Sequence, residues 1–184
     1  VIWLAVRYEQ QDDFAAAKVA RQEVLGIKVG LLDMEHWQVT DARLALKRVE
    51  LLHGLTTQQR QSIQEAITLT QTARELAKNS KPGEAVPLGE KALKIRQELL
   101  GEEHPDYAQS LKNLGWFHRE LREFDQAEPL YRKALEIQKK SLGERHPDYA
   151  LTVNNIGWLH FYQQQWDQAE ECFLKALQTY KDTV

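Results

Sequence analysis

The stretch that decides the fold is His104-Pro-Asp-Tyr-Ala108, which returns unchanged as His146-Pro-Asp-Tyr-Ala150, 42 residues further along the chain. Aligning residues 100–141 with residues 142–183 without a gap gives 20 identical positions out of 42. The shared residues include Leu-Gly openings, Asn-x-Gly-Trp cores and later Asp-Gln-Ala-Glu and Lys-Ala-Leu segments. Identity at a fixed period of this length indicates a structural repeat. A weaker copy covers residues 58–99.

Each copy is predicted to form two antiparallel helices. Pro105 and Asp106 suit a first helical turn, where a missing N–H costs nothing and a carboxylate meets the positive end of the helix dipole. Apolar residues then follow Leu111 at helical spacing, and a second amphipathic helix begins at Phe124 after a break near Arg122. Helix pairs repeated in this way stack into a solenoid.

Two glycines fall inside the predicted first helices. Gly115 and Gly157 each cost about 1 kcal/mol relative to alanine in a helix interior. We expect the missing side chain to let the second helix approach closely, with Ala127 or Ala169 on the other side.

The pattern Leu111-x-x-Leu-Gly-x-x-His118, followed by Ala127, Tyr131 and Ala134, resembles the tetratricopeptide repeat. The 42-residue period and the Leu-Gly-x-x-His-Pro-Asp linker resemble the kinesin light chain type of this repeat, which many bacterial proteins carry. The resemblance covers residues 58–183. It implies an all-α fold, a right-handed superhelical solenoid of antiparallel hairpins with about nine helices, and a bacterial source.

The N-terminal third is predicted to belong to the same array. A shift of 110 residues aligns residues 1–36 with a later repeat, so they form a truncated repeat, and residues 37–57 form an extra inserted helix. The array then continues as a degenerate repeat at 58–99 and two full repeats at 100–141 and 142–184. The inserted helix, expected over residues 39–53, could cap the array or bend it. Thr56-Thr57 offers the N-cap of the helix that follows.

Composition narrows the classes of partner. A hydrophobic fraction of 42% is ordinary for a folded helical protein and excludes a disordered chain. The net charge of −3 provides no general attraction to nucleic acid or to a membrane, and neither is predicted as a partner. The single cysteine, Cys172, cannot form an internal disulfide, which weakly favours a cytoplasmic location.

No catalytic or cofactor motif occurs. The sequence lacks a Gly-x-Ser-x-Gly elbow, a phosphate-binding glycine loop and a His-Glu-x-x-His zinc motif. The repeated histidines His104 and His146 lie in equivalent linkers one repeat apart, and His118 and His160 lie inside the hairpins, so structural roles are expected. Cys172 replaces a leucine in a buried stripe. The sequence therefore predicts no enzyme, no metal and no cofactor.

The resemblance implies that the first helices line a concave groove. Lysine or arginine there would pair with acidic groups, asparagine would bond a peptide backbone, and indole rings would give apolar contact. The candidate peptide-binding residues at the matching positions are Arg74, Lys112, Asn113, Trp116, Arg119, Asn154, Asn155, Trp158, Phe161 and Tyr162. Alternatively, the tryptophans wedge neighbouring first helices apart and the asparagines bond between repeats.

The predicted function is a scaffold that binds a peptide or protein segment in this groove. One alternative is a regulatory or substrate-recruiting arm of a larger enzyme, because proteins that resemble this one are often joined to kinase, caspase-like protease or nucleotide-binding domains. Another is an oligomerisation module. Apolar Phe161, Leu174 and Tyr180 lack a polar capping helix, which predicts either that further repeats or a second domain follow, or that the chain self-associates through the C-terminal repeat.

Overall fold

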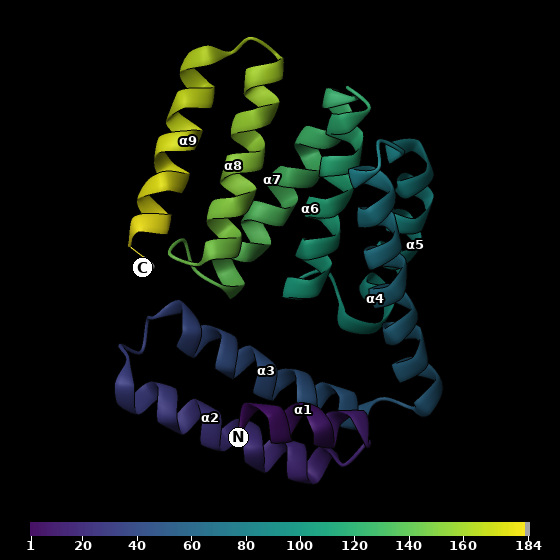
Figure 1. Cartoon of the computed structure of the whole chain (residues 1–184), viewed down its shortest axis with the longest axis vertical. Coiled ribbons are helices and arrows are strands. Elements are labelled where there is room, and N and C mark those ends of the chain that lie inside the picture. Colours follow the sequence, from purple (N-terminus) through teal and green to yellow (C-terminus); the bar gives the residue numbers. More distant parts are fainter. Residues whose placement is uncertain (183–184) are drawn as a thin grey trace. The chain divides into compact units, whose positions relative to one another are not determined.

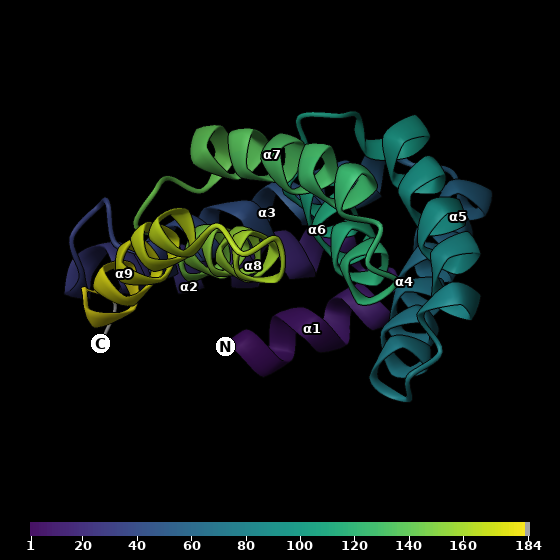
Figure 2. The same cartoon turned by 90° about the horizontal axis from the view of Figure 1, so that it is seen from above.

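The computed structural model describes residues 1–182, and every regular element in that range is an α-helix (Figures 1 and 2). The all-α fold and the expected number of helices are confirmed. The helices are α1 (Ile2–Gln10), α2 (Phe14–Leu31), α3 (Trp37–Gly54), α4 (Thr57–Lys78), α5 (Pro82–Leu100), α6 (Pro105–Glu120), α7 (Phe124–Ser141), α8 (Pro147–Tyr162) and α9 (Trp166–Lys181).

The chain divides into two compact units, Val1–Arg60 and Gln61–Val184. In the second unit, α6 pairs with α7 and α8 pairs with α9 as hairpins, while α5 packs on α6 and α7 packs on α8 (Figure 1). Helix α7 therefore contacts both its own first helix and the first helix of the next repeat. In the first unit, α2 packs against both α1 and α3.

Histidine caps the first helices. The Nδ1 atom of His104 accepts a hydrogen bond from the backbone N–H of Asp106 at 3.1 Å, and His146 accepts one from Asp148 at the same distance. His36 caps α3 in the same way, through the N–H of Gln38 at 3.2 Å. The sequence pattern predicted the helix start from proline and aspartate but did not assign this role to the histidine.

The turns inside the hairpins share one backbone conformation. Asp12, Ser80, Arg122 and Gln164 have φ between 56° and 62°, in the left-handed region that non-glycine residues rarely adopt. The next residue returns a hydrogen bond to the end of the preceding helix, as from Glu123 N to the carbonyl of His118 at 2.9 Å and its counterparts. This bond pattern ends each helix in a Schellman-type turn.

His118 and His160 brace two of these turns with their side chains. His118 Nδ1 lies 2.6 Å from Glu123 Oε2, and His160 Nδ1 lies 2.5 Å from Gln165 Oε1. Both histidines stand five residues before their partners and span the left-handed residue. Their place in the hairpin explains why a ring with a polar edge suits these positions.

The helical glycines lie against aromatic rings rather than against the expected alanines. A Cβ atom at Gly115 would lie 3.0 Å from Cε1 of Tyr131, and one at Gly157 would lie 2.7 Å from Cε1 of Phe173. Ala127 and Ala169 are buried, but neither supplies the closest atoms. The expected close approach is present, but the prediction that an alanine faces the glycine was wrong. The aromatic ring one turn after that alanine reaches the glycine instead.

The first unit is built around Phe14, Ala17 and Val49, with Tyr8 and Leu52 packed at the edge. Helix α3 covers the residues predicted to be inserted, and within this unit it lies against α2. The division of the chain into repeats at 1–36, 37–57, 58–99, 100–141 and 142–184 stays a prediction.

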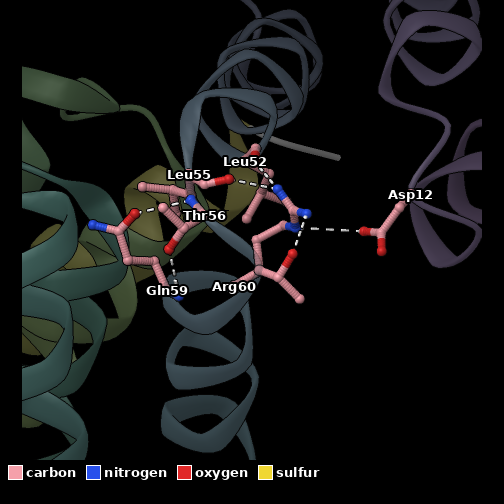
Figure 3. Close-up of polar contacts among 7 residues, drawn as sticks. Asp12, Leu52, Leu55, Thr56, Gln59 and Arg60 are labelled. Carbon is pink, nitrogen blue, oxygen red and sulfur yellow. Dashed lines mark hydrogen bonds and ion pairs between the residues drawn. The ribbon is translucent and has the colours of Figure 1, made fainter.

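A capping box starts α4, as the Thr56-Thr57 pair predicted. Gln59 N donates to Thr56 Oγ1 at 3.2 Å, and Thr56 N donates to Gln59 Oε1 at 2.9 Å (Figure 3). Beside it, the Arg60 guanidinium donates to the carbonyls of Leu52 at 3.3 Å and Leu55 at 2.5 Å, at the end of α3. Arg60 Nε also lies 3.6 Å from Asp12 Oδ1, in the turn after α1.

Replacing Arg60 with alanine is expected to destabilise the first unit by roughly 1–3 kcal/mol, because two carbonyls at the end of α3 lose a charged donor. Arg60→Lys should recover only part of the loss, since an ammonium cannot reproduce the planar fork. Hydrogen exchange across residues 1–60 measures the effect. Arg48→Ala, which removes an exposed arginine from α3, is the control and should change exchange little.

Gly157→Ala is expected to destabilise the second unit by roughly 1–3 kcal/mol, because the added methyl overlaps the Phe173 ring. Helix propensity alone predicts the opposite sign, a gain of up to about 1 kcal/mol. Gly83→Ala is the matched control, since a Cβ there meets nothing within 4 Å. Urea unfolding should show a loss for the first variant only, and a gain for both would contradict the close approach.

Candidate functional site

All ten predicted binding residues lie on the first helices of their repeats. We call the surface formed by these ten side chains the first-helix face. Helices α6 and α8 contact each other directly, and α7 lies to one side of them (Figure 2). Arg74 lies on α4; Lys112, Asn113, Trp116 and Arg119 lie on α6; Asn154, Asn155, Trp158, Phe161 and Tyr162 lie on α8.

Lys112 differs from its predicted place in an open groove. Only 3% of its surface is exposed, and its Nζ lies 3.3 Å from Asp148 Oδ1 in the first turn of α8. Burial lowers the pKa of Lys112, the Asp148 carboxylate opposes this shift, and the charge of Arg74 adds to it. The lysine therefore links two consecutive repeats instead of standing open to a ligand.

Asn113 is also largely buried. Its Oδ1 accepts a hydrogen bond from Gln109 Nε2 at 3.3 Å within α6, and its Nδ2 has no hydrogen-bond partner among residues 1–182. An unpaired buried donor costs about 1–3 kcal/mol. Asn154 and Asn155 on α8 are partly exposed. On the first-helix face, Asn154 and Asn155 therefore offer their amide groups, whereas that of Asn113 is buried.

Trp116 packs in the core with part of its ring and also lines a pocket. Its ring packs against two clusters of buried residues, one that contains Ala73 and Ala77 of α4 and one that contains Ile156 and Leu159 of α8. This arrangement agrees with the wedge alternative. A pocket of about 470 Å³ nevertheless opens beside the ring, lined by Ala77, Lys78, Ser80, Pro82, Trp116 and Glu120.

We call this space the Trp116 pocket. Its walls combine one cation, Lys78, one carboxylate, Glu120, and the indole. The indole Nε1 donates to Glu120 Oε1 at 3.0 Å, which fixes the ring. The sequence pattern did not predict Ser80 and Pro82, which lie between α4 and α5 and at the start of α5. Helical spacing identifies residues on one face of a helix, but it does not apply to a turn.

Arg119 is mostly buried and incompletely paired. Its Nη2 lies 2.7 Å from Glu120 Oε1, while its Nε and Nη1 have no partner in the described part of the chain. The hydroxyl of Tyr131 is likewise buried without a partner there. Burial raises the pKa of Tyr131, and the nearby Arg119 charge opposes the shift. The phenol is therefore a neutral group across the physiological range.

Three aromatic side chains gather at the end of α8, and we call them the aromatic patch. Trp158, Phe161 and Tyr162 each expose 40–42% of their surface. Their ring centroids are 5.5 Å apart for Trp158–Phe161 and 6.0 Å apart for Phe161–Tyr162. Phe161 also packs edge-on against Trp166 of α9 at 5.2 Å, so it lies towards α9.

Residues 1–182 provide neither a cluster of metal ligands nor a membrane-spanning helix. No group of three or more histidine, cysteine, aspartate or glutamate side chains lies close enough to hold a metal ion. Within the same range, no helix is both long enough and apolar enough to span a bilayer. Burial raises the pKa of Cys172, which makes its thiolate less available.

A sequence model described as the tetratricopeptide repeat matches residues 76–140 and 117–182, together more than half of the chain. The chain belongs to the tetratricopeptide repeat family. No curated protein matches the chain at a significant level. The family predicted from the repeats is confirmed, whereas the kinesin light chain type of repeat and the bacterial source stay predictions.

Solved structures share the fold. The chain is similar to BtubC from P. vanneervenii, with 23% identity and a TM-score of 0.57 over 97% of this chain and 60% of that one. Two structures of a putative kinesin light chain from P. anserina, one of them a single-residue variant, have nearly identical TPR-like repeats. Both are 21% identical over 98% of this chain, with TM-scores of 0.55 over 92% and 0.54 over 93% of theirs. Repeats of this family are in general protein–protein interaction modules, and the fold is typically not catalytic.

Asp148→Asn is expected to destabilise the chain more than Asp106→Asn, its counterpart one repeat earlier. Both carboxylates lie in the first turn of a helix, but only Asp148 faces a buried ammonium. Removing it leaves Lys112 unpaired, at a cost of roughly 3 kcal/mol, against about 0.3–1 kcal/mol for the dipole effect shared by both positions. Urea unfolding at pH 7 measures the difference, and equal losses would contradict the link.

The same lysine predicts a pH dependence. Its folded pKa lies below the ordinary 10.5, so between the two values the unfolded chain binds more protons and stability rises with pH. Lys112→Met removes this contribution. The variant should be at least as stable as wild type at pH 7, and its advantage should shrink as the pH approaches 10.5. A constant difference would show that burial of the ammonium carries no cost.

Proposed function

We propose that this chain is a scaffold that binds a peptide or protein segment along the first-helix face, without catalysis. The Trp116 pocket is the observation that carries the proposal, because it is a hollow on this face that joins apolar and charged walls. An indole beside a cation and a carboxylate can hold an apolar side chain and an acidic group of a peptide at the same time. The family's general role in protein–protein interaction supports the proposal.

The chemistry of the face favours an extended segment with an acidic residue beside an apolar one. An apolar side chain would rest on the Trp116 indole while a carboxylate pairs with Lys78. The exposed guanidinium of Arg74 adds positive charge on the same helix, α4. Asn154 and Asn155 have amides that suit the backbone of such a segment. Lys112 contributes as a buried positive charge, not as a direct contact.

Charge reversal at the pocket tests the proposal. Peptides selected from a displayed library of random linear sequences on the wild-type chain are expected to be rich in Asp or Glu next to an apolar residue. Lys78→Glu should weaken their binding by about tenfold or more, measured by fluorescence polarisation. Lys81→Glu is the matched control, because Lys81 lies in the same turn, pairs with Glu84 and does not line the pocket.

The aromatic patch provides the second arm of that experiment. Trp158→Ala should weaken the same peptides if they extend along α8, whereas Leu31→Ala, which removes an exposed apolar side chain from α2, should not. Peptides that bind Lys78→Glu and Trp158→Ala as well as wild type would overturn the first-helix face as the site.

A second candidate function rests on a different surface. The apolar face of α9 favours association of the C-terminal repeat with another chain, and self-association is one form of this. A regulatory or substrate-recruiting arm of a larger enzyme would use the same two surfaces. We place either activity in the cytoplasm, since the one cysteine needs no oxidising compartment.

A further inference from the structure

Helix α9 exposes the face with which the earlier second helices hold the next repeat. Five positions spaced by 42 residues make this face. They are Pro82, Ala85, Gly89, Leu93 and Arg96 on α5; Phe124, Ala127, Tyr131, Leu135 and Gln138 on α7; and Trp166, Ala169, Phe173, Leu177 and Tyr180 on α9.

On α7 these positions hold α8. Ala127 and Tyr131 form one cluster with Ile156 and Leu159 of α8. Leu135 packs on a second cluster that contains Tyr149 and Val153 of α8, and the Phe124 ring stacks on Tyr162 at 6.2 Å. At the far end, the Thr152 hydroxyl donates to Gln138 Oε1 at 2.6 Å in a buried position.

On α5 the same positions hold α6. Leu93 packs on Leu111 and Leu114, and a Cβ atom at Gly89 would lie 3.0 Å from the Phe117 ring. Arg96 donates to the Ser110 hydroxyl at the position of the Gln138–Thr152 pair. Two successive interfaces therefore use one geometry, with apolar contacts along the helices and one buried hydroxyl at the end.

The helices that dock in these two interfaces share a sequence pattern. Ser or Thr is followed by an apolar residue and then by apolar residues three and six positions later. The pattern is Ser110, Leu111, Leu114 and Phe117 in α6, and Thr152, Val153, Ile156 and Leu159 in α8. This spacing places the apolar residues on one side of a helix.

On α9 the face is exposed at two of these positions, while Ala169 is buried and Phe173 lies against Gly157 of α8. Trp166 exposes 56% of its surface and Leu177 exposes 48%. Between them lies a hollow of about 380 Å³ along α9, lined by Phe161, Trp166, Ala169, Glu170, Phe173, Leu174 and Leu177. Exposed apolar surface of this kind marks an interaction site.

We propose that the α9 face docks an amphipathic helix of a partner protein that carries this Ser/Thr–apolar–x–x–apolar–x–x–apolar pattern. The inference deepens the second candidate function above and does not depend on the first-helix face. Continuity with the two established interfaces identifies the occupant, because α9 repeats their positions in the same order and spacing. Tyr180 stands where Arg96 and Gln138 meet the hydroxyl, but its ring packs against the cluster of Tyr149, Val153 and Ala176 within the hairpin, so the apolar positions of α9 carry the inference.

Among residues 1–182, a second copy of the chain supplies no free helix with the pattern. In α4 the pattern also occurs as Ser62, Ile63, Ala66 and Leu69, but Ile63 and Ala66 are already buried there. In α6 and α8 the pattern is already buried against α5 and α7. In α1, aligned by the shift of 110 residues, Arg7 stands at the position of Phe117. In α4, aligned by 42 residues, Glu75 stands there instead. A charged residue at the centre of the apolar stripe disfavours docking of either helix.

The register provides a matched pair of variants on α9. Leu177 matches Leu135, which packs against α8. Leu174, which is 58% exposed, matches Arg132, whose side chain is 64% exposed and pairs with Glu128 instead of contacting α8. Docking in the register of the repeats therefore depends on Leu177 and not on Leu174, although both leucines line the hollow.

The probe is a synthetic peptide of the α8 sequence, residues 147–162, added to the full chain and followed by calorimetry. We expect saturable binding to wild type and Leu174→Asp, and binding weaker by about tenfold or more to Leu177→Asp. Because a short helix is marginal in water, the same sequence is also tested in cis, with residues 142–162 appended after residue 184. The appended chain should gain thermal stability and slow hydrogen exchange in α9, and Leu177→Asp should abolish both gains.

Two results would overturn the inference. Equal loss with Leu174→Asp and Leu177→Asp would show general apolar adhesion, and absence of any gain in the appended chain would show that α9 does not hold a first helix. Sedimentation of the chain alone distinguishes self-association. A concentration-dependent dimer lost in Leu177→Asp would make the occupant a second copy. None of these outcomes tests peptide binding at the Trp116 pocket, which the Lys78→Glu variant measures separately.

Discussion

The constraint on which this structure depends is that the second helix of an internal repeat must pack against two first helices at once. Helix α7 buries Tyr131 and Ala127 towards α8, while Ala134 and Ile137 pack with Leu111 of α6. A helix with apolar residues on two sides loses both interfaces if it rotates, so its orientation is fixed. The buried pairs Arg96–Ser110 and Gln138–Thr152 act in the same direction. A polar group buried without its partner costs free energy, so one repeat cannot slide along the next.

Within each hairpin, backbone details adjust the two helices to that requirement. Glycine at positions 115 and 157 brings the first helix against an aromatic ring of the second. A left-handed residue at 122 or 164 closes the connection, and the histidine before it bonds across the turn. The linker histidines then start the next first helix. Each of these features depends on residues close together in the sequence. One 42-residue unit therefore specifies both the shape of its own hairpin and the start of the next one.

The sequence predicts the features that depend on neighbouring residues, but it does not predict those that depend on contacts between repeats. Helix starts at Pro105 and Pro147, the breaks in the hairpins and the Thr56 cap depend on neighbouring residues, and the pattern predicts them correctly. The place of Lys112 depends on Asp148, 36 residues away in the next repeat, and a comparison of single repeats cannot reveal it. Trp116 and Trp158 are identical in the sequence pattern. One is half-buried because α8 covers it, and the other is exposed, so their difference comes from the neighbouring helix.

A comparison of the two best-matched repeats indicates where the chain became specialised. Positions that build the hairpin are the same in both, such as the capping histidine, the glycine and the lysine over the tyrosine ring at 5.3 Å. On the first-helix face, Asn113 and Trp116 recur as Asn155 and Trp158, whereas Lys112 is replaced by Asn154 and Arg119 by Phe161. Burial lowers the pKa of Lys112 even beside Asp148, and Arg119 keeps two buried nitrogens without a partner in the described part of the chain, so both side chains are unfavourable for folding. Packing alone would favour apolar side chains at both places, which supports the proposal that the first-helix face binds a ligand.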